Sequence, residues 1–214
     1  IGGSDHSTDV DTLRREARRN GADVLVGIHG DRLIVVVGQV PEENPDPAKT
    51  PSLFVLCSGL ANSFTEGPIV VGSEVPSITD AHKSARSALS GFSVVGAWNK
   101  APRPTSADDL LAERALAGDM LAKTTLINKI YQPLRKNSPD LLDTLVTYLE
   151  TGRSLELTAR EMFVHSNTVR YRLKKISELI GWDATGARES FVLQVATLLG
   201  KMNEPEPSGR PRES

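Results

Sequence analysis

The stretch from Leu155 to Gly181 constrains the fold of this chain more than any other segment. It reads LELTAREMFVHSNTVRYRLKKISELIG, and its apolar residues recur at spacings of three to five. On two crossed helices, positions at these spacings point into one small shared core. The stretch therefore predicts two short helices joined by a tight turn, which is the layout of a DNA-reading helix-turn-helix. The predicted core residues are Ala159, Met162, Val164, Val169, Leu173 and Ile176.

End signals bound the second of these helices. Ser166 closes the expected turn over residues 163–166 and is a good N-cap, because its hydroxyl can accept from the free backbone donors of the next turn. Gly181 is a good stop, because glycine adopts the left-handed conformation at little cost after a helix. The second helix is therefore expected over residues 167–180.

The outer face of this helix is predicted to be basic and polar. Between Arg153 and Ser177 the chain carries six basic and two acidic side chains, a local net charge of +4 in a chain whose total is −2. A surface that contacts the phosphates of DNA needs positive charge concentrated in one place, as it is here. A basic amphipathic helix can equally be a solvated surface helix, so pattern and charge alone leave both interpretations open.

The run MFVHSNTVRYRL over residues 162–173 closely resembles the C-terminal helix-turn-helix of PucR-type (CdaR-like) bacterial transcriptional regulators. The resemblance continues through residues 176–181 and upstream through 141–149 and 113–119. Phe163, in a turn where many such motifs have glycine, fits this family. The resemblance implies that the partner is double-stranded DNA, that the protein is cytoplasmic and bacterial, and that it controls metabolic or catabolic genes.

Side-chain chemistry suggests how this helix would divide its contacts. Arginine can bind guanine bidentately and asparagine can do the same for adenine. Asn167, Arg170 and Tyr171 are therefore expected to read base edges in the major groove. Lysine and hydroxyl side chains suit phosphate oxygens. The predicted phosphate contacts are Ser166, Thr168, Lys174 and Lys175.

Two further residues complete the predicted DNA-binding set. His165 is expected either to contact a phosphate or to fix the turn by hydrogen-bonding a nearby carbonyl, and Arg172 belongs to the family motif. Because one such module rarely binds tightly alone, a homodimer reading two half-sites is expected. A small-molecule effector is a candidate partner. The alternative is a helix-turn-helix that contacts protein rather than DNA.

The segment before residue 104 is expected to form an α+β domain. β-Branched runs at 24–28 and 33–37 flank Gly30 and Asp31 and predict a hairpin. The order of elements predicts a mostly antiparallel sheet with helices, and the resemblance implies a degenerate GGDEF-like, nucleotide-cyclase-like domain. The other expected elements are helices over 9–20 and 77–89 and strands over 53–57, 69–71 and 94–95.

The hairpin turn does not look catalytic. It reads His29, Gly30, Asp31, Arg32, so Arg32 stands where the resemblance implies a second acid. Phosphate chemistry assisted by a divalent metal needs several oxygen ligands. No enzyme activity, metal or cofactor is therefore expected, and an active cyclase-like signalling protein is the alternative.

Amino-acid composition and the positions of prolines predict the domain boundaries. The two prolines of residues 101–106 place a boundary after residue 103, with an all-helical domain over 104–202 and a disordered, proline-containing tail over 203–214. A loop is expected over 41–51. The single cysteine, Cys57, fits a reducing compartment, and no run approaches the ~20 apolar residues that cross a bilayer. Because the chain opens at Ile1, it is expected to be a fragment of a longer protein.

Overall fold

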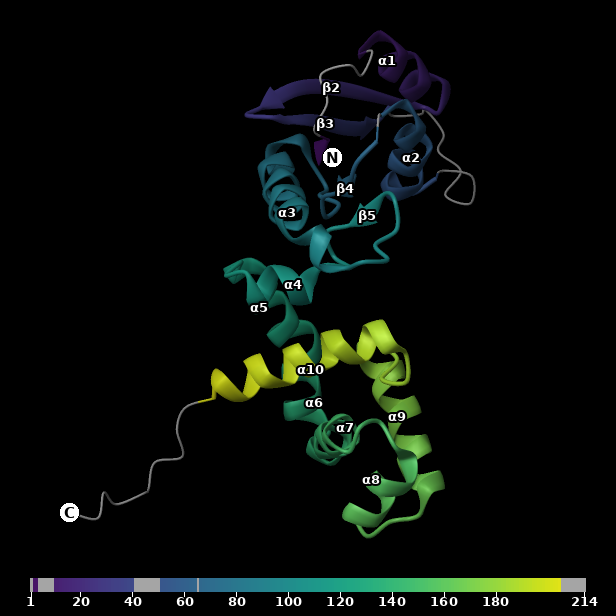
Figure 1. Ribbon diagram of the computed structural model, residues 1–214, viewed down its shortest axis with the longest axis vertical. Coiled ribbons are helices and arrows are strands. Elements are labelled where there is room, and N and C mark those ends of the chain that lie inside the picture. Colours follow the sequence, from purple (N-terminus) through teal and green to yellow (C-terminus); the bar gives the residue numbers. More distant parts are fainter. Residues whose placement is uncertain (1, 4–9, 41–50, 65, 205–214) are drawn as a thin grey trace, which may run out of the picture. The chain divides into compact units, whose positions relative to one another are not determined.

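The computed structural model describes residues 2–3, 10–40, 51–64 and 66–204. The chain divides into two compact units between Ala117 and Gly118, and each is described here by itself. The first is an α+β unit and the second is helical in the residues described, which confirms the predicted fold class (Figure 1). The expected loop over 41–50 and the tail from 205 onward lie outside the described residues.

The first unit is built on the predicted hairpin. Strands β2 (Ala22–His29) and β3 (Arg32–Gln39) pair in antiparallel register, and β1 (Gly2–Gly3) pairs with the other edge of β3. Gly30 has a φ of +63°, a backbone conformation that glycine adopts without steric cost. Helix α1 (Val10–Arg19) precedes the hairpin, as the sequence predicts.

One face of the hairpin is covered by α1 and by α2 (Leu53–Leu60), which carry Leu13, Leu56 and Leu60 into the core. The strand predicted at 53–57 is wrong, because this segment is helical. A short continuous apolar run cannot be assigned from periodicity alone. The helix is capped by Ser52, whose hydroxyl accepts from the backbone N–H of Val55 at 3.4 Å.

The strand predicted at 69–71 forms, but it joins a separate sheet. Strand β4 (Val70–Val71) pairs in parallel with β5 (Thr105–Ser106). Helix α3 (Ala81–Val94) follows a 3-10 turn at Ile78–Asp80, and it continues past residue 89, where the helix was expected to end, and through Gly91. A Cβ at Gly91 would lie 2.9 Å from the Val70 side chain, so this glycine permits close packing. The strand predicted at 94–95 is therefore wrong.

The two units divide between residues 117 and 118, not after residue 103 as expected. Arg103 donates to the carbonyl of Gly67 at 2.8 Å, and the N–H of Thr105 donates to Ile69 at 2.9 Å. Helix α4 (Leu111–Leu116) packs on α3. The prolines at 102 and 104 therefore belong to a loop within the first unit.

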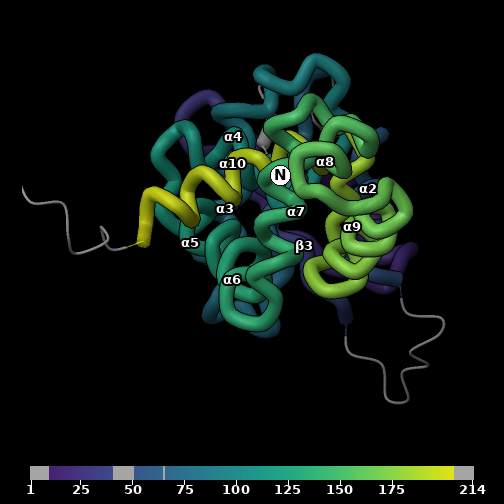
Figure 2. Tube along the Cα trace, turned by 90° about the horizontal axis from the view of Figure 1, so that it is seen from below, coloured from purple at the N-terminus to yellow at the C-terminus, as the bar shows by residue number. Residues whose placement is uncertain are grey.

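The second unit is a helical bundle. Its first part is a continuous helical segment made of α5 (Met120–Leu126), the π-helical segment η4 (Ile127–Tyr131) and α6 (Gln132–Asn137). Helix α10 (Ala187–Met202) packs across η4. Between them come α7 (Pro139–Glu150), α8 (Leu155–Glu161) and α9 (Ser166–Ile180). Figure 2 traces α7, α8 and α9 in succession. No helix in the described parts of the chain is long and apolar enough to span a membrane.

Helix α10 and the residues after it complete this unit. Phe191 and Leu198 of α10 are 36% and 55% exposed, because α10 buries Val192, Leu193, Val195 and Ala196. The tail was expected to be disordered from residue 203, but its second residue, Glu204, is held by two hydrogen bonds. Glu204 accepts from the Tyr131 hydroxyl and from Arg135 Nε, each at 2.7 Å. Burial and this bond to Glu204 raise the pKa of Tyr131 to about 12.

Candidate nucleic-acid interface

Helices α7, α8 and α9 form the predicted helix-turn-helix with its supporting helix. Ala159, Val169, Leu173 and Ile176 are buried, as predicted. Met162 and Val164 are half-buried, because the turn between α8 and α9 lies at the surface. The positions that face inward are thus those that the spacing of apolar residues indicates.

The supports of α8 are local hydrogen bonds. Ser154 caps the helix, because its hydroxyl accepts from the N–H of Leu157 at 3.3 Å. The hydroxyls of Thr151 and Thr158 lie 2.8 Å apart and join the end of α7 to α8. These bonds hold the first helix of the motif against its supporting helix.

The N-cap of α9 is His165 rather than Ser166. The His165 Nδ1 atom accepts from the N–H of Asn167 at 3.1 Å, and Ser166 is the first residue of the helix. This bond fixes the turn, which is one of the two roles expected of His165, although the ring accepts from an N–H and the expected partner was a carbonyl. Gly181 ends α9 with a φ of +79°, as predicted.

The exposed face of α9 brings together most of the predicted DNA-binding side chains. Asn167, Arg170, Tyr171, Lys174 and Lys175 are exposed, whereas Ser166 and Thr168 are half-buried in the first turn. Arg170 donates to the Asn167 side-chain oxygen at 2.8 Å, so the two residues expected to read bases lie side by side. Both present hydrogen-bonding groups suited to base edges.

Lys175 and Tyr171 lie together further along α9. Lys175 donates to Glu178 at 2.8 Å, which raises the pKa of the lysine, and its ammonium lies 5.8 Å from the centre of the Tyr171 ring. A surface ion pair of this kind contributes little to stability. Lys175 can therefore exchange Glu178 for a phosphate at small cost.

Arg172 does not share the exposed face. It is half-buried, and its guanidinium donates at 3.1 Å to the hydroxyl of Thr144, which is buried on α7. Arg172 therefore ties α9 to its supporting helix. Its place in the motif is explained by packing rather than by a position beside Arg170.

Phe163 is a surface residue whose importance the sequence reasoning missed. It lies in the turn before α9, is 96% exposed and has a φ of +54°. The left-handed conformation costs a non-glycine residue roughly 1–2 kcal/mol, and a fully exposed phenyl ring gains nothing from folding to offset it. The sequence signal for this exposed ring is a phenylalanine at a turn position where many such motifs have glycine.

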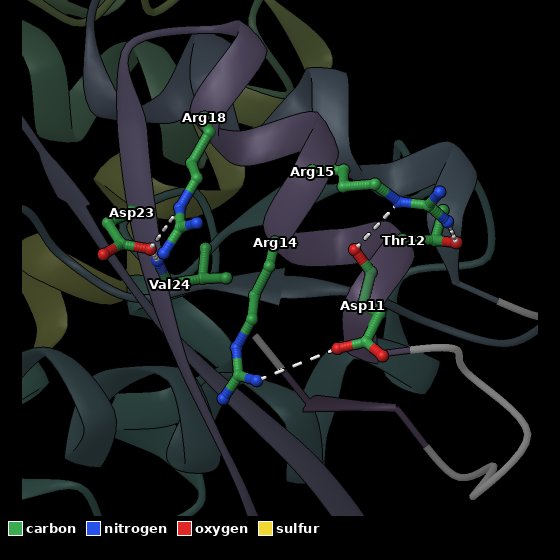
Figure 3. Close-up of polar contacts among 7 residues, drawn as sticks. All are labelled: Asp11, Thr12, Arg14, Arg15, Arg18, Asp23 and Val24. Carbon is green, nitrogen blue, oxygen red and sulfur yellow. Dashed lines mark hydrogen bonds and ion pairs between the residues drawn. The ribbon is translucent and has the colours of Figure 1, made fainter.

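A second cluster of basic side chains lies on α1. Figure 3 shows Arg14 directed to the Asp11 carboxylate at 3.9 Å and Arg18 to Asp23 at 3.8 Å. Arg15 donates to the Asp11 carbonyl and to the Thr12 hydroxyl. These contacts are exposed and contribute little to stability, and the cluster lies in the first unit, outside the helix-turn-helix.

The hairpin turn of the first unit places Asp31 beside Arg32, with 3.7 Å between Oδ1 and Nε. Arg32 also lies 4.9 Å from the centre of the Phe92 ring. Within the described ranges, no group of three or more His, Cys, Asp or Glu side chains gathers into a metal-binding arrangement. The contacts around Arg32 are structural ones between the hairpin and α3.

Two family models match the chain. The PucR C-terminal helix-turn-helix domain matches residues 141–199, and the GGDEF-like domain matches residues 2–94. The first match contains α8, the turn and α9. The second contains the hairpin and reaches the end of α3.

Two of the similar proteins match most of this chain, and a third matches about a third of it. The crystal structure of a regulator of polyketide synthase expression from Bifidobacterium adolescentis is 34% identical, covers 95% of this chain and 80% of its own, and superposes with a TM-score of 0.78. An uncharacterized protein of Mycobacterium bovis is 41% identical over 91% of this chain. The purine catabolism regulatory protein of Bacillus subtilis is 35% identical over 32% of this chain and 13% of its own length.

The chain spans 45% of the length of the mycobacterial relative. The solved structure is matched over most of both chains, and the two family models account for both units in the same order along the sequence. The chain therefore belongs to the PucR-type family, with a GGDEF-like domain followed by a PucR C-terminal helix-turn-helix domain.

Proposed function

We propose that this chain is a sequence-specific transcriptional regulator of a bacterial cytoplasm, and that α9 enters the major groove of double-stranded DNA. The observation that carries the proposal is the exposed face of α9. Asn167, Arg170 and Tyr171 read bases, and Lys174 and Lys175 contact phosphates. Ser166 and Thr168, in the first turn, add hydroxyl contacts to the backbone of the duplex.

The mode of binding follows from the size of the module. A single helix-turn-helix contacts one half-site, and dimers bind half-sites about one helical turn, ~34 Å, apart. We therefore infer a homodimer on DNA. The names of two relatives concern polyketide synthase expression and purine catabolism, which supports metabolic genes as targets.

The same observations disfavour an enzyme. A cyclase-like activity would need oxygen ligands for a divalent ion near the hairpin turn, and Asp31 there lies beside Arg32 instead. Regulators dominate the named relatives. The first unit therefore serves the DNA-binding unit rather than catalysing a reaction of its own.

Binding should be sequence-selective and strongly salt-dependent. Genomic fragments selected on the full chain would supply the duplex, and a scrambled duplex of equal length would be the control. For about four neutralised phosphates, raising the salt from about 50 to 200 mM should weaken binding roughly a hundredfold. Affinity that is flat with salt, or equal for the scrambled duplex, would instead indicate a protein-binding module.

Phe163 provides a second test. We infer that its ring contacts the duplex beside the α9 N-terminus, because a costly backbone conformation presents it to solvent. Phe163→Gly should keep the free energy of unfolding or raise it by up to about 1 kcal/mol, since glycine adopts this conformation readily. The affinity for the selected duplex should fall about five- to tenfold, as expected for loss of about 1 kcal/mol.

The control for Phe163 is Phe191→Ala, which removes an exposed phenyl ring from α10 instead of from the turn. It should leave DNA affinity unchanged. If Phe163→Gly binds the duplex as well as the native chain does, Phe163 is not part of the interface.

A further inference from the structure

An open-sided cavity of about 1040 Å³ lies within the first unit. It is lined by the β2–β3 hairpin, α2, α3 and the chain segments 71–78 and 106–109. In Figure 1, α1 lies on one side of the hairpin and α3 on the other. The volume falls at the upper end of the range of small-molecule sites, roughly 300–1,000 Å³.

The cavity exists because α3 presents small side chains to it. The strand register places Leu25 opposite Val36, on the hairpin face whose alternate residues also include Ile34. Leu25 is 67% exposed although it is a large apolar residue. The α3 residues that line the cavity are mostly alanine and serine, namely Ala81, Ser84, Ala85, Ala88 and Leu89.

The two faces of the hairpin therefore differ. The face toward α1 and α2 is filled by leucines that belong to one buried cluster. The face toward α3 keeps apolar surface accessible, because Leu25 is exposed and Ile34 and Val36 are only half-buried, and an apolar pocket of this kind is the usual setting of a ligand site.

The wall of the cavity beside α3 is held rigidly. A Cβ at Gly72 would lie 2.2 Å from the Ser84 carbonyl, so the 71–78 segment lies directly on the helix. The N–H of Ser73 donates to Ser87 Oγ at 2.8 Å, and the Ser73 hydroxyl donates to the Asp108 carboxylate at 2.6 Å. The cavity wall is therefore preformed, which lowers the entropic cost of binding.

The charge of the lining has one sign. Its charged side chains are the carboxylates of Asp23, Glu74, Asp108 and Asp109, and no Lys, Arg or His is among the described residues that line it. Asp23 is paired with Arg18 at 3.8 Å. Glu74, Asp108 and Asp109 lie on the 71–78 and 106–109 segments, which the hydrogen bond from Ser73 to Asp108 joins, so negative charge is concentrated there.

This charge selects among ligand classes. A nucleotide or another phosphate would bring further negative charge to carboxylates and would be repelled. An ammonium or amidinium group is attracted to them, while an apolar body covers Leu25, Ile34 and Val36. Electrostatic complementarity of this kind sets specificity.

We propose that this cavity is a binding site for a small organic cation with an apolar body, its positive group at Glu74 and Asp108 and its apolar part between the hairpin and α3. The site is independent of DNA binding by α9. It would give the first unit a ligand-sensing function.

A matched series of probes tests the charge preference. Octylammonium, 1-octanol and octanoate share one chain length and differ in the charge of the head group. Calorimetric titration of the full chain should show tightest binding for octylammonium and weakest for octanoate. Equal or tighter binding of octanoate would overturn the proposal, and equal binding of all three would show non-specific adsorption in its place.

Two substitutions locate the binding. Glu74→Gln should weaken octylammonium binding about two- to fivefold, in keeping with one exposed charge pair, and leave 1-octanol unchanged. The control is Asp31→Asn, which removes an exposed carboxylate from the hairpin turn outside the cavity. If both variants bind octylammonium equally, Glu74 does not hold the cation.

Ala85→Leu fills the cavity from α3 and should weaken binding of all three probes at least tenfold. A thermal unfolding curve establishes that the variant is folded. If a folded Ala85→Leu chain binds the probes as the native chain does, the ligands lie elsewhere and the proposal fails. The Glu74→Gln comparison remains decisive if Ala85→Leu does not fold.

Discussion

Replacing Arg170 by alanine should weaken binding to the selected duplex by roughly 1–3 kcal/mol, about five- to 150-fold, and relax its preference at one base pair. Arg170 is exposed on α9 and donates to Asn167 at 2.8 Å, so the two side chains form one hydrogen-bonding unit on the reading face. A side chain that touched only phosphate would lower the affinity for all sequences alike.

Arg170→Lys separates charge from geometry. Lysine keeps the positive charge but lacks the planar fork that binds guanine O6 and N7 together. The lysine variant should therefore retain the salt dependence of the native chain and still lose base preference. Gel-shift titrations at two salt concentrations measure both quantities. Full retention of affinity in Arg170→Ala would remove Arg170 from the interface.

Gly200→Ala should destabilise the second unit by roughly 1–3 kcal/mol or more, as overpacking of a core does. The new Cβ would lie 2.1 Å from Tyr131 Cγ and 2.3 Å from Cδ2. The Tyr131 ring cannot retreat easily, because it is 2% exposed and its hydroxyl donates to Glu204 at 2.7 Å. The close approach of α10 to the π-helical segment η4 therefore requires glycine.

Thermal unfolding followed by circular dichroism measures this effect. For a unit of about a hundred residues, a loss of 2–3 kcal/mol lowers the melting temperature by on the order of 10 °C. The matched control is Gln194→Ala on the exposed side of the same helix, which should melt close to the native chain. Equal melting temperatures for Gly200→Ala and the control would contradict the packing of α10 on Tyr131.

The sequence predicts the helix-turn-helix well because its signals are local. The spacing of Val169, Leu173 and Ile176 specifies one face of a helix, and Gly181 specifies its end. The hairpin is predicted equally well, because its turn residues lie between two β-branched runs. Each of these elements depends on contacts within a few residues.

The features that the sequence did not predict depend on contacts between distant segments. The boundary between the units follows from the pairing of β4 with β5, whose residues are far apart along the chain. The helix at 53–60 follows from packing of Leu56 and Leu60 on the hairpin. The cavity beside α3 is lined by segments that are far apart along the chain, and no local pattern encodes it.

Within the candidate interface, the direction of single side chains escaped prediction for the same reason. Arg172 turns to Thr144 because α7 passes beside α9 at that level. His165 caps α9 because the turn brings its ring over the N–H of Asn167. Both residues belong to the motif, yet they stabilise the fold where the motif suggests contact with DNA.

The most direct test of base reading by α9 is a double-mutant cycle between protein and duplex. The native chain and Arg170→Lys would be titrated against the selected duplex and a series of single base-pair substitutions. If α9 reads bases, the penalty for one base pair should disappear in the lysine variant, and the penalties elsewhere should remain. Penalties that add at every base pair would show that Arg170 reads no base, and the proposed docking of α9 in the major groove would then be wrong.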